Sequence, residues 1–198
     1  MVKIVVASSN LGKLREYRQL LKALDNLEFL SCRNYGILEM PEETGSSFSE
    51  NSEIKAQAVF DVVNSWTIAD DSGLVVPALK GAPGVFSARY AGIEATDRTN
   101  MEKLLQEMEV LEGSARSAYF ECCITLLGPD GYRRTFDGRC EGRIIDEMRG
   151  GNGFGYDPLF IKNDYDKTFA ELGEHTKNII SHRGKAVEKL KLALEYIR

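Results

Sequence analysis

The sequence has few cysteines and histidines, the residues that form stabilising disulfides in small proteins or bind structural metals. Its 198 residues include four cysteines and two histidines, and no two cysteines form a CxxC pair. This scarcity argues against a structural zinc site and against a Cys–His nucleophile. We expect reduced, buried thiols, and the N-terminus shows no signal-peptide pattern. Both observations predict a cytoplasmic protein.

Long apolar runs and an excess of basic charge are also missing. The longest apolar runs, such as residues 4–7 and 122–127, are much shorter than a membrane span. The formal net charge is −5, which disfavours a broad basic face for nucleic acid. The hydrophobic fraction of 43% and the charged fraction of 28% are typical of a folded globular chain. We therefore predict no membrane segment, no stable nucleic acid binding and one domain over residues 1–198.

Hydrophobic periodicity predicts strands and helices that alternate along the chain. Strands are expected at residues 2–7, 28–32 and 66–69, and helices at residues 11–24, 47–64, 99–108 and 181–197. The third strand is expected to end on Asp70–Gly73. Gly128–Gly131 separates two further strands in a hairpin. This order predicts an α/β fold with a mixed central β-sheet and flanking helices, in which the hairpin forms a second lobe beside a cleft.

Residues 8–13 join the first strand to the first helix and could grip a phosphate. The free N–H groups and positive dipole end of a helix N-terminus suit an anion, and Lys13 adds a charge. The paired glycines and the Lys-Ser/Thr of a P-loop are absent. An ordinary helix cap built by Ser8 and Asn10 is the alternative.

Carboxylates gather in two places that could bind a cation. Asp70 and Asp71 follow a short apolar strand, where a carboxylate pair could hold Mg²⁺ and orient a water. A turn made by Asp-Ser-Gly is the alternative. Glu42 and Glu43 lie in the loop before the second helix, and a solvated surface is the alternative there.

A glycine-rich loop, Gly150–Pro158, could approach a ligand closely. Phe154 and Tyr156 offer stacking faces for a base, and Asp157 could accept hydrogen bonds. A tight turn with core aromatics is the alternative.

Basic side chains are expected at two helices. His182 and Arg183 fall in the first turn of the last helix, with Lys177 just before it. Positive charge is unfavourable at a helix N-terminus, so these residues indicate a bound anion. Asn51 and Lys55 share one face of the second helix through i, i+4 spacing. Solvated surface charge is the alternative in both places.

Together these segments predict a nucleoside triphosphate site. They offer groups that could bind a phosphate, a metal ion, the face of a base and a further anion. The sequence also closely resembles the inosine/xanthosine triphosphate pyrophosphatases, which hydrolyse deaminated purine nucleotides. The segments that carry the resemblance run in order along the chain: 8–13, 41–56, 69–92, 150–160 and 177–186. One departure is Ser8-Ser9, where the family often has Thr-Gly, and serine makes that turn less permissive than glycine.

The resemblance implies a hydrolase that cleaves ITP, dITP and XTP between the α and β phosphates, giving a monophosphate and pyrophosphate, and so keeps these nucleotides out of nucleic acids. It implies Mg²⁺ held by Glu42 and Asp71, with Asp71 also activating the water and Asp70 as support. It implies a homodimer, with loop 77–96 near its interface, and two lobes around a nucleotide-binding cleft. The implied substrate contacts are Ser8, Ser9, Asn10, Leu11, Gly12, Lys13, Lys55, Ser72, Phe154, Gly155, Tyr156, Asp157, Lys177, His182 and Arg183.

Two other functions stay open. One is a Maf-type nucleotide pyrophosphatase acting on pyrimidine or modified nucleotides. The other is a nucleotide-binding regulator without turnover. The Asp70–Asp71 pair disfavours the regulator, because binding alone needs no metal-activated water.

Overall fold

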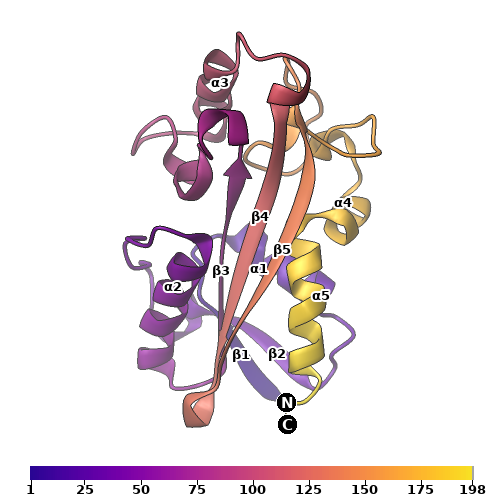
Figure 1. The fold of residues 1–198 in the computed structure, drawn as a ribbon. Coiled ribbons are helices and arrows are strands. Elements are labelled where there is room, and N and C mark those ends of the chain that lie inside the picture. Colours follow the sequence, from indigo (N-terminus) through magenta and orange to yellow (C-terminus); the bar gives the residue numbers. More distant parts are fainter. Residues whose placement is uncertain (198) are drawn as a thin grey trace. The chain divides into compact units, whose positions relative to one another are not determined.

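One six-stranded sheet organises the described residues, 1–197, of this computed structural model; the side chain of Leu11 lies outside the description. The strands are β1 (Val2–Val6), β2 (Leu27–Ser31), β3 (Thr67–Val75), β4 (Ser117–Leu127), β5 (Arg133–Ile144) and β6 (Phe160–Lys162). Their order in the sheet is β2-β1-β3-β4-β5-β6 (Figure 1). β1 is parallel to β2 and β3, whereas β5 is antiparallel to β6. The predicted α/β fold with a mixed sheet is therefore confirmed.

Helices flank the sheet, and side-chain caps set where the first three of them begin. They are α1 (Leu11–Leu20), α2 (Phe48–Val63), α3 (Asp97–Glu107), α4 (Glu174–Ile180) and α5 (His182–Leu194). Asn10 caps α1 and Ser47 caps α2, because each side chain accepts a backbone N–H from the first turn. α2 stops at Asn64, whose left-handed backbone (φ 45°) closes the helix.

The chain divides into two compact units. Unit 1 comprises Met1–Asp71, Cys122–Gly138 and Arg183–Arg198, and unit 2 comprises Ser72–Glu121 and Arg139–His182. Strands β3, β4 and β5 each contribute residues to both units. The single domain over residues 1–198 and the nucleotide-binding cleft both stay predictions.

Unit 1 buries apolar residues on both faces of its part of the sheet. Ile68 of β3 belongs to a core cluster with α1 and α5, whereas Ala69 belongs to a cluster with α2. Successive side chains of a strand point to opposite faces. Asp70 therefore lies on the face of α1 and α5, and Asp71 lies on the face of α2.

Aromatic rings fill the core of unit 2. Phe120 of β4 stacks on Phe169, with ring centroids 5.9 Å apart and an interplanar angle of 8°. Phe160 of β6 packs on both rings, with centroid distances of 4.8 and 5.0 Å. Leu104 of α3 and Tyr156 belong to the same cluster. Through Tyr156, this core holds one end of the glycine-rich loop that precedes β6.

The structure corrects three expectations about secondary structure. β3 does not end on Asp70–Gly73 but continues to Val75, because the buried Leu74 and Val75 extend the strand and outweigh the turn preference of Asp-Ser-Gly. α3 begins at Asp97, two residues before the predicted start at residue 99, because Thr96 caps the helix and Thr99 completes the capping box from the third helical position. α4 is missing from the sequence-based prediction because seven residues give too little periodicity to detect.

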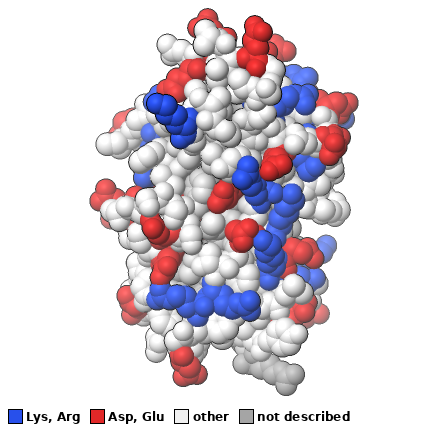
Figure 2. All heavy atoms as spheres, viewed as in Figure 1, with Lys and Arg blue, Asp and Glu red and all other residues white. Residues whose placement is uncertain are grey.

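Charged side chains of both signs are scattered over the face drawn in Figure 2. Lys and Arg on this face lie beside Asp or Glu. Along β5 the exposed positions alternate in sign: Asp137, Arg139, Glu141 and Arg143. This face is therefore of mixed charge. Within residues 1–197, none of the helices has the length and apolar character needed to cross a membrane.

Candidate active site

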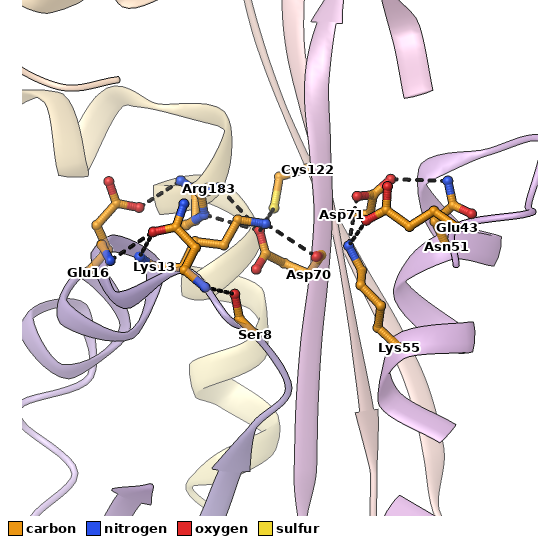
Figure 3. A network of polar contacts seen from close by, with 12 residues as sticks. Ser8, Lys13, Glu16, Glu43, Asn51, Lys55, Asp70, Asp71, Cys122 and Arg183 are labelled. Atoms are coloured by element: carbon orange, nitrogen blue, oxygen red, sulfur yellow. Dashed lines mark hydrogen bonds and ion pairs between the residues drawn. The ribbon is translucent and has the colours of Figure 1, made fainter. Parts of the chain in front are cut away.

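On the side of β3 that faces α2, two carboxylates share one ammonium group (Figure 3). Lys55 Nζ lies 2.8 Å from Asp71 Oδ1 and 2.8 Å from Glu43 Oε1. Asn51 Nδ2 donates a hydrogen bond to Asp71 Oδ2 at 3.4 Å. Asn51 and Lys55 both face Asp71 because i, i+4 positions lie on the same side of a helix. The cluster combines two carboxylates with one fixed positive charge.

The pKa values in this cluster favour proton transfer to Asp71. Burial raises the pKa of the Asp71 carboxyl against the opposing attraction of the Lys55 ammonium, and the charge of Glu43 raises it further. Burial alone would lower the pKa of Lys55, but the carboxylates of Asp71, Asp70 and Glu43 outweigh burial and raise it. Lys55 therefore stays protonated, while Asp71 is a stronger base than an ordinary aspartate.

On the side of α1 and α5, Asp70 is held by two cations. Asp70 Oδ2 lies 2.9 Å from Lys13 Nζ and 3.1 Å from Arg183 Nη2, and Arg183 Nη1 lies 2.6 Å from Glu16 Oε2. Burial would raise the pKa of Asp70, but Lys13 and Arg183 outweigh burial and hold it well below its usual range. The thiol of Cys122, 3.9 Å from Asp70 Oδ2, has a pKa raised by burial and by this carboxylate. Asp70 therefore stays ionised and is a poor proton acceptor.

The turn of residues 8–13 caps its own helix. Asn10 Oδ1 accepts the N–H of Gly12 at 2.8 Å and the N–H of Lys13 at 3.4 Å. Ser8 Oγ accepts the N–H of Asn10 at 3.1 Å. Ser9 and Gly12 are exposed. Two of the N–H groups expected for a phosphate are thus bound by Asn10, and phosphate binding by this turn stays a prediction.

In unit 2, Phe154 presents an aromatic surface beside a buried ion pair. The Phe154 side chain is 39% exposed, and Lys177 Nζ lies 4.7 Å from its ring centroid. The same ammonium lies 2.5 Å from Asp157 Oδ2, which also accepts the N–H of Phe154 at 3.0 Å. Phe154, Asp157 and Lys177, which the sequence places in separate motifs, therefore form one cluster.

Tyr156 and Gly155 anchor this loop to the rest of unit 2. Tyr156 is 3% exposed, and its hydroxyl donates to the carbonyl of Ser87 at 2.9 Å. The N–H of Gly155 donates to Asp97 Oδ2, at the start of α3, at 2.7 Å. The Tyr156 ring belongs to the core and is not an open stacking face. The roles of Tyr156 and Gly155 in substrate binding stay predictions.

His182 lies against the aromatic core of unit 2. Its ring stacks on Phe120, with centroids 4.8 Å apart and an interplanar angle of 13°. His182 is buried, and Ser72, the residue after Asp71 in β3, is half-buried. Contact of either residue with a substrate stays a prediction.

Comparison with known proteins decides the family. A family model described as the Ham1 family matches residues 4–193. The chain belongs to the Ham1 family. It is 50% identical over 198 residues, 100% of both chains, to a dITP/XTP pyrophosphatase of Protochlamydia amoebophila. It is 46% identical to a dITP/XTP pyrophosphatase of Chlamydia trachomatis, over 99% of this chain and 94% of the relative.

A solved structure of a HAM1 protein from Coxiella burnetii supports the same assignment. It superposes with a TM-score of 0.91 at 44% identity and covers 98% of this chain and 99% of its own. The resemblance read from the sequence motifs is therefore confirmed along the length of the chain.

For this Ham1-family chain, sequence reasoning placed some site residues differently from the structure. Glu42 is exposed, whereas Glu43 contacts Lys55 beside Asp71. Metal binding by Glu42 stays a prediction. Asp70 and Asp71 do not form one carboxylate pair, because they lie on opposite faces of β3 (Figure 3). The alternation of strand side chains is a signal that would have separated them.

Three polar residues of these clusters were missing from the predicted site. Asn51 binds Asp71, Glu16 binds Arg183, and Asp97 binds the loop at Gly155. The i, i+4 spacing of Asn51 and Lys55 is visible in the sequence, and it indicated their shared face. No comparable sequence signal links Glu16 to Arg183 or Asp97 to Gly155, because these contacts join segments that are distant along the chain.

Proposed function

We propose that this chain hydrolyses deaminated purine nucleoside triphosphates, namely ITP, dITP and XTP, to the monophosphate and pyrophosphate. The relatives that cover the whole chain at 46–50% identity carry the name dITP/XTP pyrophosphatase. The structural observation that carries the proposal is Asp71, a buried carboxylate with a raised pKa, held beside the Lys55 ammonium. Such a group suits the removal of a proton from water.

We propose that different residues of unit 1 have different roles in the hydrolysis. Asp71 takes the proton of the attacking water as the bond between the α and β phosphates breaks. Lys55, which stays protonated, neutralises charge that develops on the phosphates. Lys13 and the turn 8–13 bind phosphate oxygens, with the N–H groups now held by Asn10 as further donors. Positioning and charge neutralisation, more than covalent chemistry, supply the rate.

Mg²⁺ is the metal that we propose for this reaction, and the donor set of unit 1 fits it. Glu43 and Asp71 converge on one ammonium at 2.8 Å each, so the same oxygens are placed to hold a cation. Within residues 1–197 there is no group of three or more His, Cys, Asp or Glu arranged around a metal position. Mg²⁺ commonly takes one or two carboxylates and completes its shell with water and substrate phosphates. When bound, it would neutralise phosphate charge and lower the pKa of a water.

Base recognition is proposed for unit 2. The ring of Phe154 stacks on the purine, and the ion pair of Lys177 and Asp157 lies beside that ring. His182 of the same unit is a further proposed contact. The N–H groups of Phe154 and Gly155 now bind carboxylates. A 6-oxo group on the base can replace a carboxylate as their acceptor, whereas the 6-amino group of adenine cannot.

A substrate panel tests the proposal. ITP, dITP, XTP, ATP, GTP, CTP and UTP are each incubated with the chain and Mg²⁺, and pyrophosphate and orthophosphate are measured separately. We expect pyrophosphate, and kcat/KM for ITP, dITP and XTP about a hundredfold above the other nucleotides, since mismatched buried polar groups cost about 1–3 kcal/mol each. Equal kcat/KM for ITP and ATP would favour a Maf-type enzyme. Binding without turnover would favour a regulator.

We further propose a homodimer that works as a single functional domain in the cytoplasm. The loop 77–96 in unit 2 exposes Phe86 by 57% and Ile93 by 94%, which suits a contact with a second copy. One family model spans residues 4–193. All four cysteines are free and buried, as suits a reducing compartment. Light scattering that gives a monomer mass at micromolar concentration would contradict the dimer.

A further inference from the structure

Asn51 connects two parts of the Asp71 cluster that come from different segments of unit 1. Its side chain is fully buried, at 0% exposed, in the first turn of α2. Asn51 Oδ1 accepts the backbone N–H of Gly45 at 2.8 Å, while Nδ2 donates to Asp71 Oδ2 at 3.4 Å (Figure 3). A backbone N–H can only donate, and a carboxylate can only accept. The position therefore needs an acceptor and a donor on one short planar group, which is an asparagine amide.

The loop before α2 is shaped around this amide. A Cβ atom at Gly45 would lie 2.7 Å from Asn51 Oδ1 and 2.7 Å from the Cβ of Glu50. Both distances are too short for any residue with a side chain, so glycine is required for the N–H to reach Asn51. Two residues earlier, Glu43 contacts Lys55. The Gly45 contact therefore fixes the part of the loop that carries Glu43.

A second anchor holds the same loop from the solvent side. The backbone N–H and the hydroxyl of Ser46 both donate to Glu50 Oε2, at 2.6 and 2.8 Å. This anchor is exposed, and its two hydrogen bonds join only Ser46 and Glu50. Asn51 differs because one of its two hydrogen bonds ends on the loop and the other ends on Asp71. A change at Asn51 therefore alters both carboxylate positions at once.

We propose that Asn51 is a positioning residue for the hydrolysis, which holds the Glu43 loop and the Asp71 carboxylate in one fixed arrangement. The inference rests on the proposed function, through the role of Asp71 as the base. Asn51 touches no reacting atom and acts through Asp71 and Glu43. Misplacing a reacting group by about 1 Å can lower a rate about a hundredfold. The loss of Asn51 is therefore expected to lower kcat more than it changes KM.

Asn51→Leu and Ser52→Ala form the test pair. Leucine has the same branched skeleton of heavy atoms as asparagine but no polar atoms, so it removes both hydrogen bonds. Ser52 is the neighbouring buried residue, and its hydroxyl bonds Thr125 and the carbonyl of Ser49 at 2.7 and 2.8 Å, away from the Glu43 loop. With dITP as substrate, we expect kcat to fall about a hundredfold in Asn51→Leu, with little change in KM. Ser52→Ala is expected to lose stability but to keep a kcat near that of the unmodified chain.

Amide hydrogen exchange supplies a readout that does not depend on activity. The Gly45 N–H is expected to be protected in the unmodified chain and in Ser52→Ala, and to exchange fast in Asn51→Leu. Gly45→Ala breaks the same contact from the loop side. If both changes act through this contact, the double variant loses no more kcat than the worse single variant. Additive losses would contradict the shared contact.

Asn51→Asp distinguishes the effects of the two hydrogen bonds. It also replaces Asn51→Leu as the test variant if Asn51→Leu does not fold. Aspartate keeps the acceptor for Gly45 but loses the donor to Asp71, so we expect a protected Gly45 amide together with a lowered kcat. Unchanged kcat in Asn51→Leu or Asn51→Asp, or a Gly45 amide that exchanges equally slowly in Asn51→Leu, would overturn the positioning role. If the unmodified chain does not hydrolyse dITP, the proposed function fails, whereas Gly45 exchange still reports the contact.

Discussion

Two adjacent aspartates of β3, both buried, have opposite chemical surroundings. Asp70 contacts the cations of Lys13 and Arg183, which hold its pKa well below the usual range. Asp71 shares the Lys55 ammonium with a second carboxylate, Glu43, and burial raises its pKa. The difference follows from strand geometry, because consecutive side chains point to opposite faces. On one face the carboxylate meets α1 and α5, and on the other it meets α2.

One of the two carboxylates therefore has a structural role, and the other is suited to proton transfer. Two carboxylates whose environments push their pKa values apart commonly divide into a permanently charged group and a proton-transfer group. Asp70 matches the first description, since it balances buried cations of α1 and α5. Asp71 matches the second, since it lies beside the loop and helix that carry Glu43 and Lys55. Four substitutions test this division.

The largest expected effect is the loss of turnover in Asp71→Asn. Asparagine keeps the shape of the side chain but cannot accept the proton of water, so kcat should fall by about 10²–10⁴-fold. Stability should be kept or slightly raised, because burial disfavours the ionised carboxylate that asparagine replaces. Steady-state kinetics with dITP at saturating Mg²⁺ and a thermal melt measure both quantities. Near-normal turnover would show that Asp71 is not the base.

The main expected effect of Asp70→Asn is a loss of stability. It leaves the cations of Lys13 and Arg183 in unit 1 without their charged partner, and Arg183 is 2% exposed. Breaking a buried ion pair by removing one partner costs about 3–5 kcal/mol, which corresponds to a fall in Tm of roughly 10 °C for a chain of this size. Calorimetry of both aspartate variants gives the comparison. A larger drop in Tm for Asp71→Asn than for Asp70→Asn would reverse the assignment of roles.

Much of the fold follows from local sequence patterns. The apolar run of β1, the hairpin around Gly128–Gly131 and the helical periodicity of residues 47–64 each predict an element that the structure contains. The predicted end of β3 was wrong. Asp-Ser-Gly has a strong turn preference, but burial of Leu74 and the pairing of the strand outweigh it, and these are tertiary effects.

The sequence predicted which segments carry site residues, but it did not predict which of their side chains contact one another. Lys55 and Asp71 were expected to act on the same substrate, and the structure joins them directly. The guanidinium of Arg183 is buried against Asp70 and Glu16, and its expected contact with a substrate stays a prediction. The pairing of these groups depends on how α1 and α5 pack on the sheet, which no local pattern encodes.

Glu43→Gln and Glu42→Gln form a matched pair on the Asp71 side. The family resemblance implies Glu42 as a metal ligand, whereas the structure brings Glu43 to Lys55 and leaves Glu42 exposed. We expect Glu43→Gln to raise the Mg²⁺ concentration for half-maximal activity about tenfold. Glu42→Gln should change it less, and base selectivity should be unaffected in both. Titration of Mg²⁺ by calorimetry gives the same comparison without substrate. A larger effect at Glu42 would restore the sequence-based assignment.

The smallest expected effect is a difference in how pH acts on the stability of the two aspartate variants. The pKa of Asp70 is lower in the folded chain than in the unfolded chain. Its ionised form therefore stabilises the fold above its unfolded pKa of about 4, and this contribution is lost as pH falls toward the folded pKa. The gap in unfolding free energy between the unmodified chain and Asp70→Asn should be widest near neutral pH and should narrow below about pH 4.

Asp71 has the opposite sign, because its pKa is raised on folding. Its contribution to stability is complete below its unfolded pKa and is lost as pH rises through the folded pKa. Asp71→Asn, which cannot ionise, should therefore gain stability relative to the unmodified chain over that same rise in pH. Urea unfolding of the three proteins from acid to neutral pH, without Mg²⁺, measures both trends. Parallel curves for the two variants would mean that the aspartates share one environment, and the division between the two faces of β3 would not hold.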